Sequence, residues 1–152
     1  ARSRGRIGIM PDVKQYPGRL HEQFAASIEK ALVENGMLED AYFIGAQAIK
    51  EYFRGRAMTS FRHPYAEAKK IVADNPNIVE EKYIFAHAED FNQEEVDGLQ
   101  SLGFTIIVSI NTFHYTDADP IEQGKQDIRD MVALGVDGIQ IDSVYDDILD
   151  MK

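Results

Sequence analysis

One recurring pattern constrains the fold of this chain more than any other feature. A short run of β-branched or aromatic residues is followed by a longer amphipathic stretch, and this unit repeats along the whole sequence. Strands alternating with helices in this way predict a parallel sheet covered by helices, which is the α/β class. The six predicted strands are 7–13, 41–46, 56–61, 82–88, 105–112 and 138–142.

The stretches between these runs have the period of amphipathic helices. The clearest example carries Leu20, Phe24, Ile28 and Leu32 on one face, and Gly36 is placed to end the helix. The connections are short, so we expect residues 1–152 to form a single domain. The predicted helices are 20–35, 47–53, 64–74, 93–101, 120–134 and 144–150.

Two α/β architectures fit this order of elements. One is an open, doubly wound sheet of the flavodoxin-like type, and the other is part of a (β/α)₈ barrel, which needs about 250 residues when complete. The sequence contains no Gly-x-Gly-x-x-Gly or Walker motif, so dinucleotide-binding and P-loop folds have no support. The pattern of strands and helices alone leaves both architectures open.

Composition excludes several classes of function. The net charge of −10 argues against a surface for duplex nucleic acid, which is normally basic. No apolar run approaches the roughly 20 residues of a membrane span. The chain has no cysteine, which excludes disulfides, thiolate catalysis and Cys-ligated zinc. We therefore expect neither a nucleic-acid partner nor a membrane span.

Polar residues follow the predicted strands, where parallel α/β folds carry their chemistry. Asp12 and Lys14 are spaced i, i+2 at the end of the first strand, so their side chains share a face. If that face points inward, the two charges need a metal ion, a phosphate or each other as a partner. His87, in the sequence FAHAED, is a candidate catalytic proton carrier. His63 and His114 are weaker candidates of the same kind.

Three segments resemble one enzyme family. The sequence GVDGIQID at 135–142 resembles the closing strand of the glycerophosphodiester phosphodiesterases, which usually reads Gly-Val-Asp-Gly-Ile-x-Thr-Asp. IMPDVK at 9–14 resembles the mid-barrel strand Ile-Glu-(Ile/Leu)-Lys, with Asp12 in place of the glutamate. TIIVSINTF at 105–113 resembles the penultimate strand, Val-x-x-Trp-Thr-Val-Asn, with Val108 in place of the aromatic residue. The three segments occur in the family's order.

The resemblance implies a fold and an activity. The family has the phosphodiesterase version of the TIM barrel, so this chain would hold about six of the eight strands. Its members hydrolyse small phosphodiesters of glycerol with a divalent metal ion, Ca²⁺ or Mg²⁺, as part of lipid metabolism. Asp12 matches the metal-ligand carboxylate, and Lys14 matches the lysine that faces the phosphate. Asn111 and Asp142 fall at the substrate pocket.

The chain also departs from the family pattern. The family's His-Arg pair, its Glu-x-Asp metal motif and its second histidine belong to the first two strands, and this sequence has no counterpart of them. The resemblance therefore covers about the last three-fifths of a family member. We expect an amino-terminal segment or a second chain to complete the barrel, and we expect the chain alone to be inactive. The alternative is a degenerate, non-catalytic barrel that serves as a binding or scaffold protein.

Overall fold

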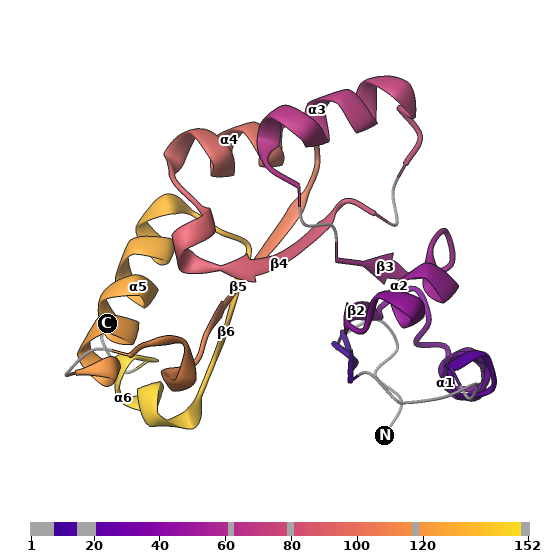
Figure 1. Cartoon of the computed structure of the whole chain (residues 1–152), viewed down its shortest axis with the longest axis horizontal. Coiled ribbons are helices and arrows are strands. Elements are labelled where there is room, and N and C mark those ends of the chain that lie inside the picture. The colour runs from indigo at the N-terminus through magenta and orange to yellow at the C-terminus, as the bar shows by residue number, and fades with distance from the viewer. Residues whose placement is uncertain (1–7, 15–20, 61–62, 79–80, 117–118, 150–152) are drawn as a thin grey trace. The chain divides into compact units, whose positions relative to one another are not determined.

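A computed structural model of the chain describes residues 8–14, 21–60, 63–78, 81–116 and 119–149. The predicted mixture of strands and helices is confirmed (Figure 1). The chain forms two compact units, each with its own three-stranded parallel sheet. The first unit contains residues 1–61 and 75–83, and the second contains residues 62–74 and 84–152.

The sheet of the first unit is formed by three short strands in chain order, β1-β2-β3. Parallel pairing places Asp12 opposite Ile44 and Tyr42 opposite Met58. Isolated parallel bridges, Ile9 with Ala41 and Ser60 with Tyr83, extend the pairing beyond the strands. The strands are β1 (Asp12–Val13), β2 (Tyr42–Gly45) and β3 (Met58–Thr59).

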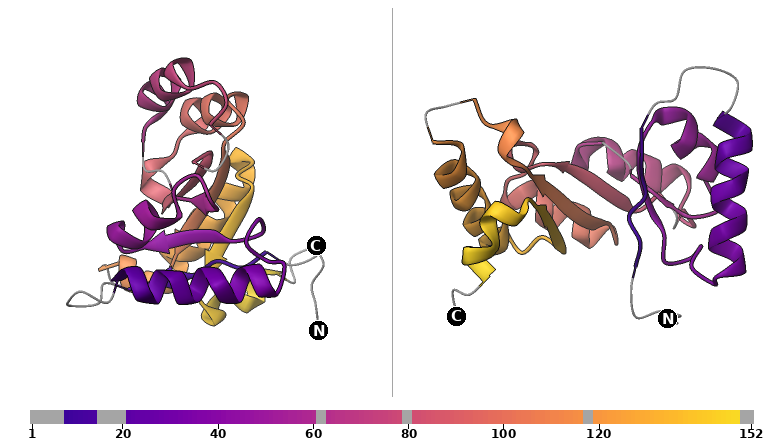
Figure 2. Two further views of the ribbon diagram at one scale, coloured as in Figure 1. Left: turned by 90° about the vertical axis from the view of Figure 1, so that its right-hand side faces the viewer. Right: turned by 90° about the horizontal axis from the view of Figure 1, so that it is seen from below.

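Two helices, α1 (His21–Glu34) and α2 (Gln47–Phe53), pack together in the first unit, and α2 also packs against β2 (Figure 2). The rings of Phe43 and Phe53 stack with their centroids 3.8 Å apart. This pair lies in a core that is completed by small and aliphatic side chains. These are Ala25, Leu32, Ala41, Ile49 and Ala57.

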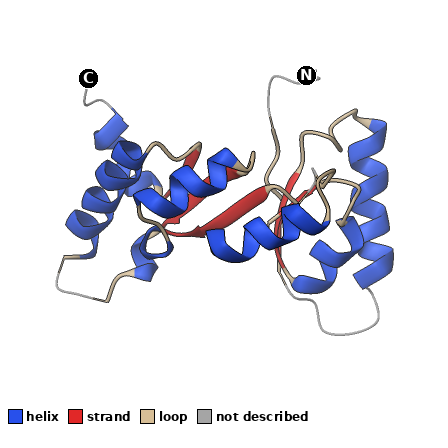
Figure 3. Cartoon of the chain, turned by 90° about the horizontal axis from the view of Figure 1, so that it is seen from above, coloured by secondary structure: helices blue, strands red, loops and turns tan. Residues whose placement is uncertain are grey.

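The sheet of the second unit has the order β4-β5-β6, from β4 (Tyr83–His87) through β5 (Thr105–Ile110) to β6 (Gly138–Ile141). The β5–β6 ladder is parallel and runs from Ile107 opposite Gly138 to Ile110 opposite Ile141. Helices flank these strands (Figure 3). They are α3 (Tyr65–Asp74), α4 (Gln93–Ser101), α5 (Pro120–Leu134), α6 (Asp146–Leu149) and the short 3-10 helices η1 (Ala88–Asp90), η2 (Thr112–His114) and η3 (Ser143–Tyr145).

Local sequence explains where the main helices of this unit begin and end. Asn92 caps α4 by accepting a hydrogen bond from the Glu95 N–H at 3.0 Å. Asp119 caps α5 in the same way, and Pro120 occupies the first turn. Gly135 ends α5 with φ +77°, a left-handed conformation that glycine adopts without strain. Helices α3 and α4 lie side by side (Figure 1).

Most predicted boundaries hold to within two residues, and the helices at 47–53, 93–101 and 120–134 match fully. The first strand is shorter than predicted, because only Asp12–Val13 forms a ladder, with the bridge at Ile9 before it. Ile7, the predicted start, lies outside the described residues. Both described sheets have their strands in sequential order, as in βα barrels, and neither has the 2-1-3 order of a flavodoxin-like sheet. Among the described residues, no helix is long and apolar enough to cross a membrane.

Candidate functional site

Polar side chains gather at the carboxyl ends of β4, β5 and β6 in the second unit. His87 is the last residue of β4, Asn111 follows β5, and Asp142 follows β6. The 3-10 helices η1 and η2 add Glu89 and His114 to the same end of the sheet. Because the three strands are parallel, residues that follow each of them lie at one edge, which is where α/β folds carry their chemistry.

Two of these residues form a direct pair. The imidazole rings of His87 and His114 lie with their centroids 4.1 Å apart and their planes tilted by 32°. Burial lowers the pKa of His114, and the neighbouring His87 lowers it further. The carboxylates of Asp142 and Glu89 and a hydrogen bond to the Ser109 backbone act in the opposite direction. The net effect lowers the pKa of His114, which favours the neutral imidazole over the charged form.

The predicted substrate-pocket residues Asn111 and Asp142 both lie at this edge, but their side chains bond within the chain. Asp142 Oδ2 accepts hydrogen bonds from the N–H and the hydroxyl of Thr112, at 2.7 and 2.9 Å. Asn111 is buried and donates through Nδ2 to the Ser109 hydroxyl at 2.8 Å. That hydroxyl in turn donates to Gln140 Oε1 at 3.3 Å.

Asp12 and Lys14 lie in the first unit and form an ion pair with each other. The prediction that they share a face is therefore confirmed, although that face is exposed. The Lys14 side chain is 82% accessible and that of Asp12 is 41% accessible. Gly45 makes this close pairing of β1 and β2 possible, because a Cβ at position 45 would lie 2.3 Å from the Val13 carbonyl oxygen. The sequence left a metal ion, a phosphate or each other open as partners for these two charges. In the structure, the two side chains are partners of each other.

The fit to a divalent cation is incomplete. Ca²⁺ takes six to eight oxygen ligands, and Mg²⁺ takes six, of which one or two are usually protein carboxylates and the rest are water and substrate oxygens. Asp12 offers one carboxylate, which already contacts the Lys14 ammonium. No group of three His, Asp or Glu side chains placed to hold a metal ion occurs in the part of the chain that the structure describes. The described residues therefore do not make a dication site by themselves.

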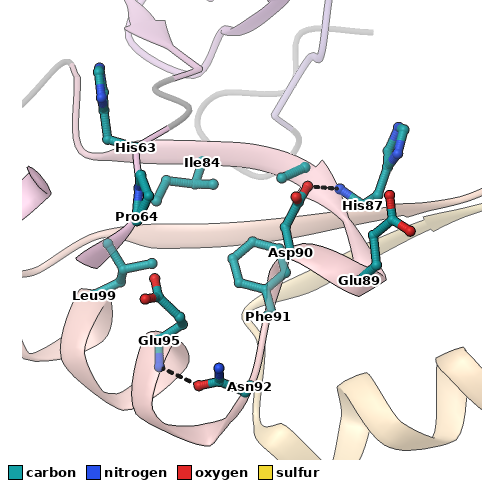
Figure 4. Close-up of a pocket in the computed structure, with 11 residues that line it drawn as sticks. His63, Pro64, Ile84, His87, Glu89, Asp90, Phe91, Asn92, Glu95 and Leu99 are labelled. Carbon is teal, nitrogen blue, oxygen red and sulfur yellow. Dashed lines mark hydrogen bonds between the residues drawn. The ribbon is translucent and has the colours of Figure 1, made fainter. Parts of the chain in front are cut away.

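A pocket of about 580 Å³ lies beside the histidine pair, lined on one side by His87 and Glu89. Its apolar wall includes Leu99, and the Phe91 ring and the Glu95 carboxylate border the same space (Figure 4). Glu95 Oε2 accepts the Tyr65 N–H at 2.7 Å, so this carboxylate is held between α3 and α4. Phe91 and Glu95 were not among the site residues predicted from the sequence. Glu95 stands three residues after the cap Asn92, a spacing that indicates a helix cap and gives no sign of a pocket.

Comparisons with known proteins bear on the fold. No protein-family model matches the chain, and no curated protein matches it. One solved structure that resembles it is a glycerophosphodiester phosphodiesterase from Parabacteroides distasonis, with a TM-score of 0.63 and 15% sequence identity. The likeness covers 93% of this chain and 56% of that one, so the chain spans a little over half of the neighbour's length. At this identity the likeness shows the fold. The chain shares a phosphodiesterase-like α/β fold with a TIM-barrel neighbour.

Proposed function

We propose that this protein acts on phosphodiesters of the glycerophosphodiester type. In this proposal the chain is part of a phosphodiester hydrolase, and the substrate binds at the carboxyl ends of the strands. The observation that carries this proposal is the His87–His114 pair at the ends of β4 and β5. Support comes from the phosphodiesterase-like fold and from the three sequence segments that resemble the family.

Phosphodiester hydrolysis needs one group that takes a proton from the attacking water and one that gives a proton to the leaving alcohol. The lowered pKa of His114 favours the neutral imidazole, which is the form that can accept a proton. His87 is partly exposed at the end of its strand, and its ring contacts that of His114, so it suits the second role. Lys14, in the first unit, enters the proposal through the family resemblance, in which the matching lysine offsets charge that develops on the phosphate.

A divalent cation, Ca²⁺ or Mg²⁺, belongs to the proposal through the family resemblance. Such an ion would supply Lewis-acid stabilisation of the phosphoryl oxygens. Asp12 is the residue proposed to contribute one of its ligands. Since the described residues do not complete such a site, we expect His87 and His114 to bind the diester in this chain, and to act as acid and base only where further ligands complete the cation site.

The test measures binding and turnover on the same sample. The chain is labelled with ¹⁵N and titrated with a glycerophosphodiester, with and without Ca²⁺ or Mg²⁺, while ³¹P spectra record any product. We expect chemical-shift changes at His87, Asn111 and His114. The sequence has no counterpart of the family's His-Arg pair and Glu-x-Asp motif, so we expect no turnover from the chain alone.

The outcome of this experiment distinguishes a hydrolase from a non-catalytic binding protein. If the chain hydrolyses the diester and His87→Ala abolishes turnover while Lys30→Ala, in a surface ion pair of the first unit, does not, the histidine pair carries the chemistry. Binding that persists without turnover, in longer forms of the protein as well, would favour the alternative of a non-catalytic binding member. An absence of shift changes at the strand ends would refute the proposed function in both forms.

A further inference from the structure

The two aspartates of GVDGIQID form equivalent bonds at opposite ends of β6. Asp137 Oδ2 accepts the backbone N–H of Ile106 at 2.8 Å, just before the β5–β6 ladder begins. Asp142 Oδ2 accepts the backbone N–H of Thr112 at 2.7 Å, just after the ladder ends. Each carboxylate therefore accepts a hydrogen bond from a backbone N–H that lies outside the β5–β6 ladder. One of these N–H groups is in β5, and the other lies just after it. We call these two residues the aspartate clamps.

The second clamp, Asp142, differs from the first because it bonds to the 3-10 helix η2. Thr112 is the first residue of η2, and Asp142 receives both its N–H and its hydroxyl. His114 is the last residue of η2, and its N–H donates to the Asn111 carbonyl at 3.0 Å, which closes the turn. The same short turn carries the His114 side chain, whose ring lies against that of His87.

We infer that Asp142 is a positioning residue, which holds η2 so that the His114 ring lies against His87. The inference rests on the proposed function, because only there does the histidine pair have a chemical role. Among the described residues, the charged or titratable side chains that act on the pKa of His114 are the carboxylates of Asp142 and Glu89 and the imidazole of His87. Asp142 is the one that also bonds to the backbone of the turn, so it affects both the place of the ring and its charge.

The experiment uses the full chain and needs no turnover. NMR records the cross-peak between the His87 and His114 rings and the pH titration of each ring. In Asp142→Ala we expect the ring–ring cross-peak to be lost and the titration of His114 to shift. In Asp142→Asn, which keeps an acceptor for the Thr112 N–H, we expect the cross-peak to survive and the pKa of His114 to fall, because a favourable negative charge is gone.

Asp137→Ala is the matched control. It removes the same kind of bond from the other end of the same strand, so we expect it to lower stability without changing the cross-peak or the His114 titration. If Asp142→Ala does not fold, Thr112→Val removes only the hydroxyl donor, and we expect a weakened cross-peak. The inference is overturned if the Asp142 variants leave the histidine pair unchanged, or if Asp137→Ala disturbs it equally. If the Asp142 variants behave as expected but the chain does not respond to the phosphodiester, the proposed function is refuted and the positioning role of Asp142 stands.

Discussion

Replacing Gly98 by alanine tests how tightly α3 and α4 are packed. Gly98 is buried in α4, directly beneath the ring of Tyr65 at the start of α3. A Cβ at position 98 would lie 2.6 Å from Cγ and 2.7 Å from both Cδ atoms of that ring. These atoms are at the base of the side chain rather than at its flexible end, so the ring cannot move aside without moving α3.

Two opposing effects set the magnitude. Alanine is favoured over glycine in a helix interior by about 1 kcal/mol. Overpacking a well-packed contact costs about 1–3 kcal/mol, and three ring atoms inside normal contact distance place this case near the upper end. We therefore expect Gly98→Ala to lower the free energy of unfolding by about 1–2 kcal/mol. In a Tyr65→Ala background the clash is absent, and the same substitution should stabilise by about 1 kcal/mol.

Urea unfolding, followed by far-UV circular dichroism, measures all four proteins of this double-mutant cycle. Hydrogen exchange of the β4 and β5 amides confirms that the change lies in the second unit. We expect Gly98→Ala to destabilise the protein when Tyr65 is present and to stabilise it in the Tyr65→Ala background. Stabilisation by Gly98→Ala in the presence of Tyr65, or an equal effect in both backgrounds, would refute the argument from close packing.

Three further predictions concern pH, the proposed chemistry and the sheet edges. Because the pKa of His114 is lower in the folded state, the unfolded chain binds more protons, and stability should decrease as the pH falls below about 6.5. Urea unfolding measured across that pH range should show a smaller decrease in the free energy of unfolding for His114→Gln than for the unsubstituted protein. In any form of the protein that cleaves a glycerophosphodiester, Lys14→Ala should slow turnover by roughly 10²–10³. Asp12→Ala should abolish metal-dependent cleavage, and Lys30→Ala, which removes one partner of a surface ion pair, should leave cleavage unchanged. Among the described residues β6 pairs on one side only, so we expect light scattering to show an assembly larger than 17.2 kDa, whereas a stable monomer at high concentration would contradict this.

The sequence predicted the helices well because their signals are local. Asn92 and Asp119 cap the helices that follow them, and Gly103 and Gly135 have positive φ after the helices that precede them. Such signals need only a few neighbouring residues. The ends of the short strands were less predictable, since pairing depends on residues far away in the sequence. Ile9 pairs only through an isolated bridge, although its composition suits a strand.

The candidate site was predictable only in part. The i, i+2 spacing of Asp12 and Lys14 correctly placed both side chains on one face. Their exposure was not predictable, because it depends on what covers the strand. The contact between His87 and His114 joins two strand ends that are 27 residues apart in sequence, and no local pattern indicates it. Position after a strand predicted that each residue would lie at the carboxyl edge, which the structure confirms.

The bonds of GVDGIQID change what this motif says about function. Both of its carboxylates accept hydrogen bonds from backbone groups of β5 or the turn after it, and Gly138 packs against the side chain of Ile107. These interactions align two neighbouring parallel strands, and any barrel with such a strand pair would gain from them. The motif therefore has a structural role in aligning two adjacent strands, besides what the family resemblance implies for function. The proposal for the chemistry rests on other side chains at the same edge of the sheet, the rings of His87 and His114.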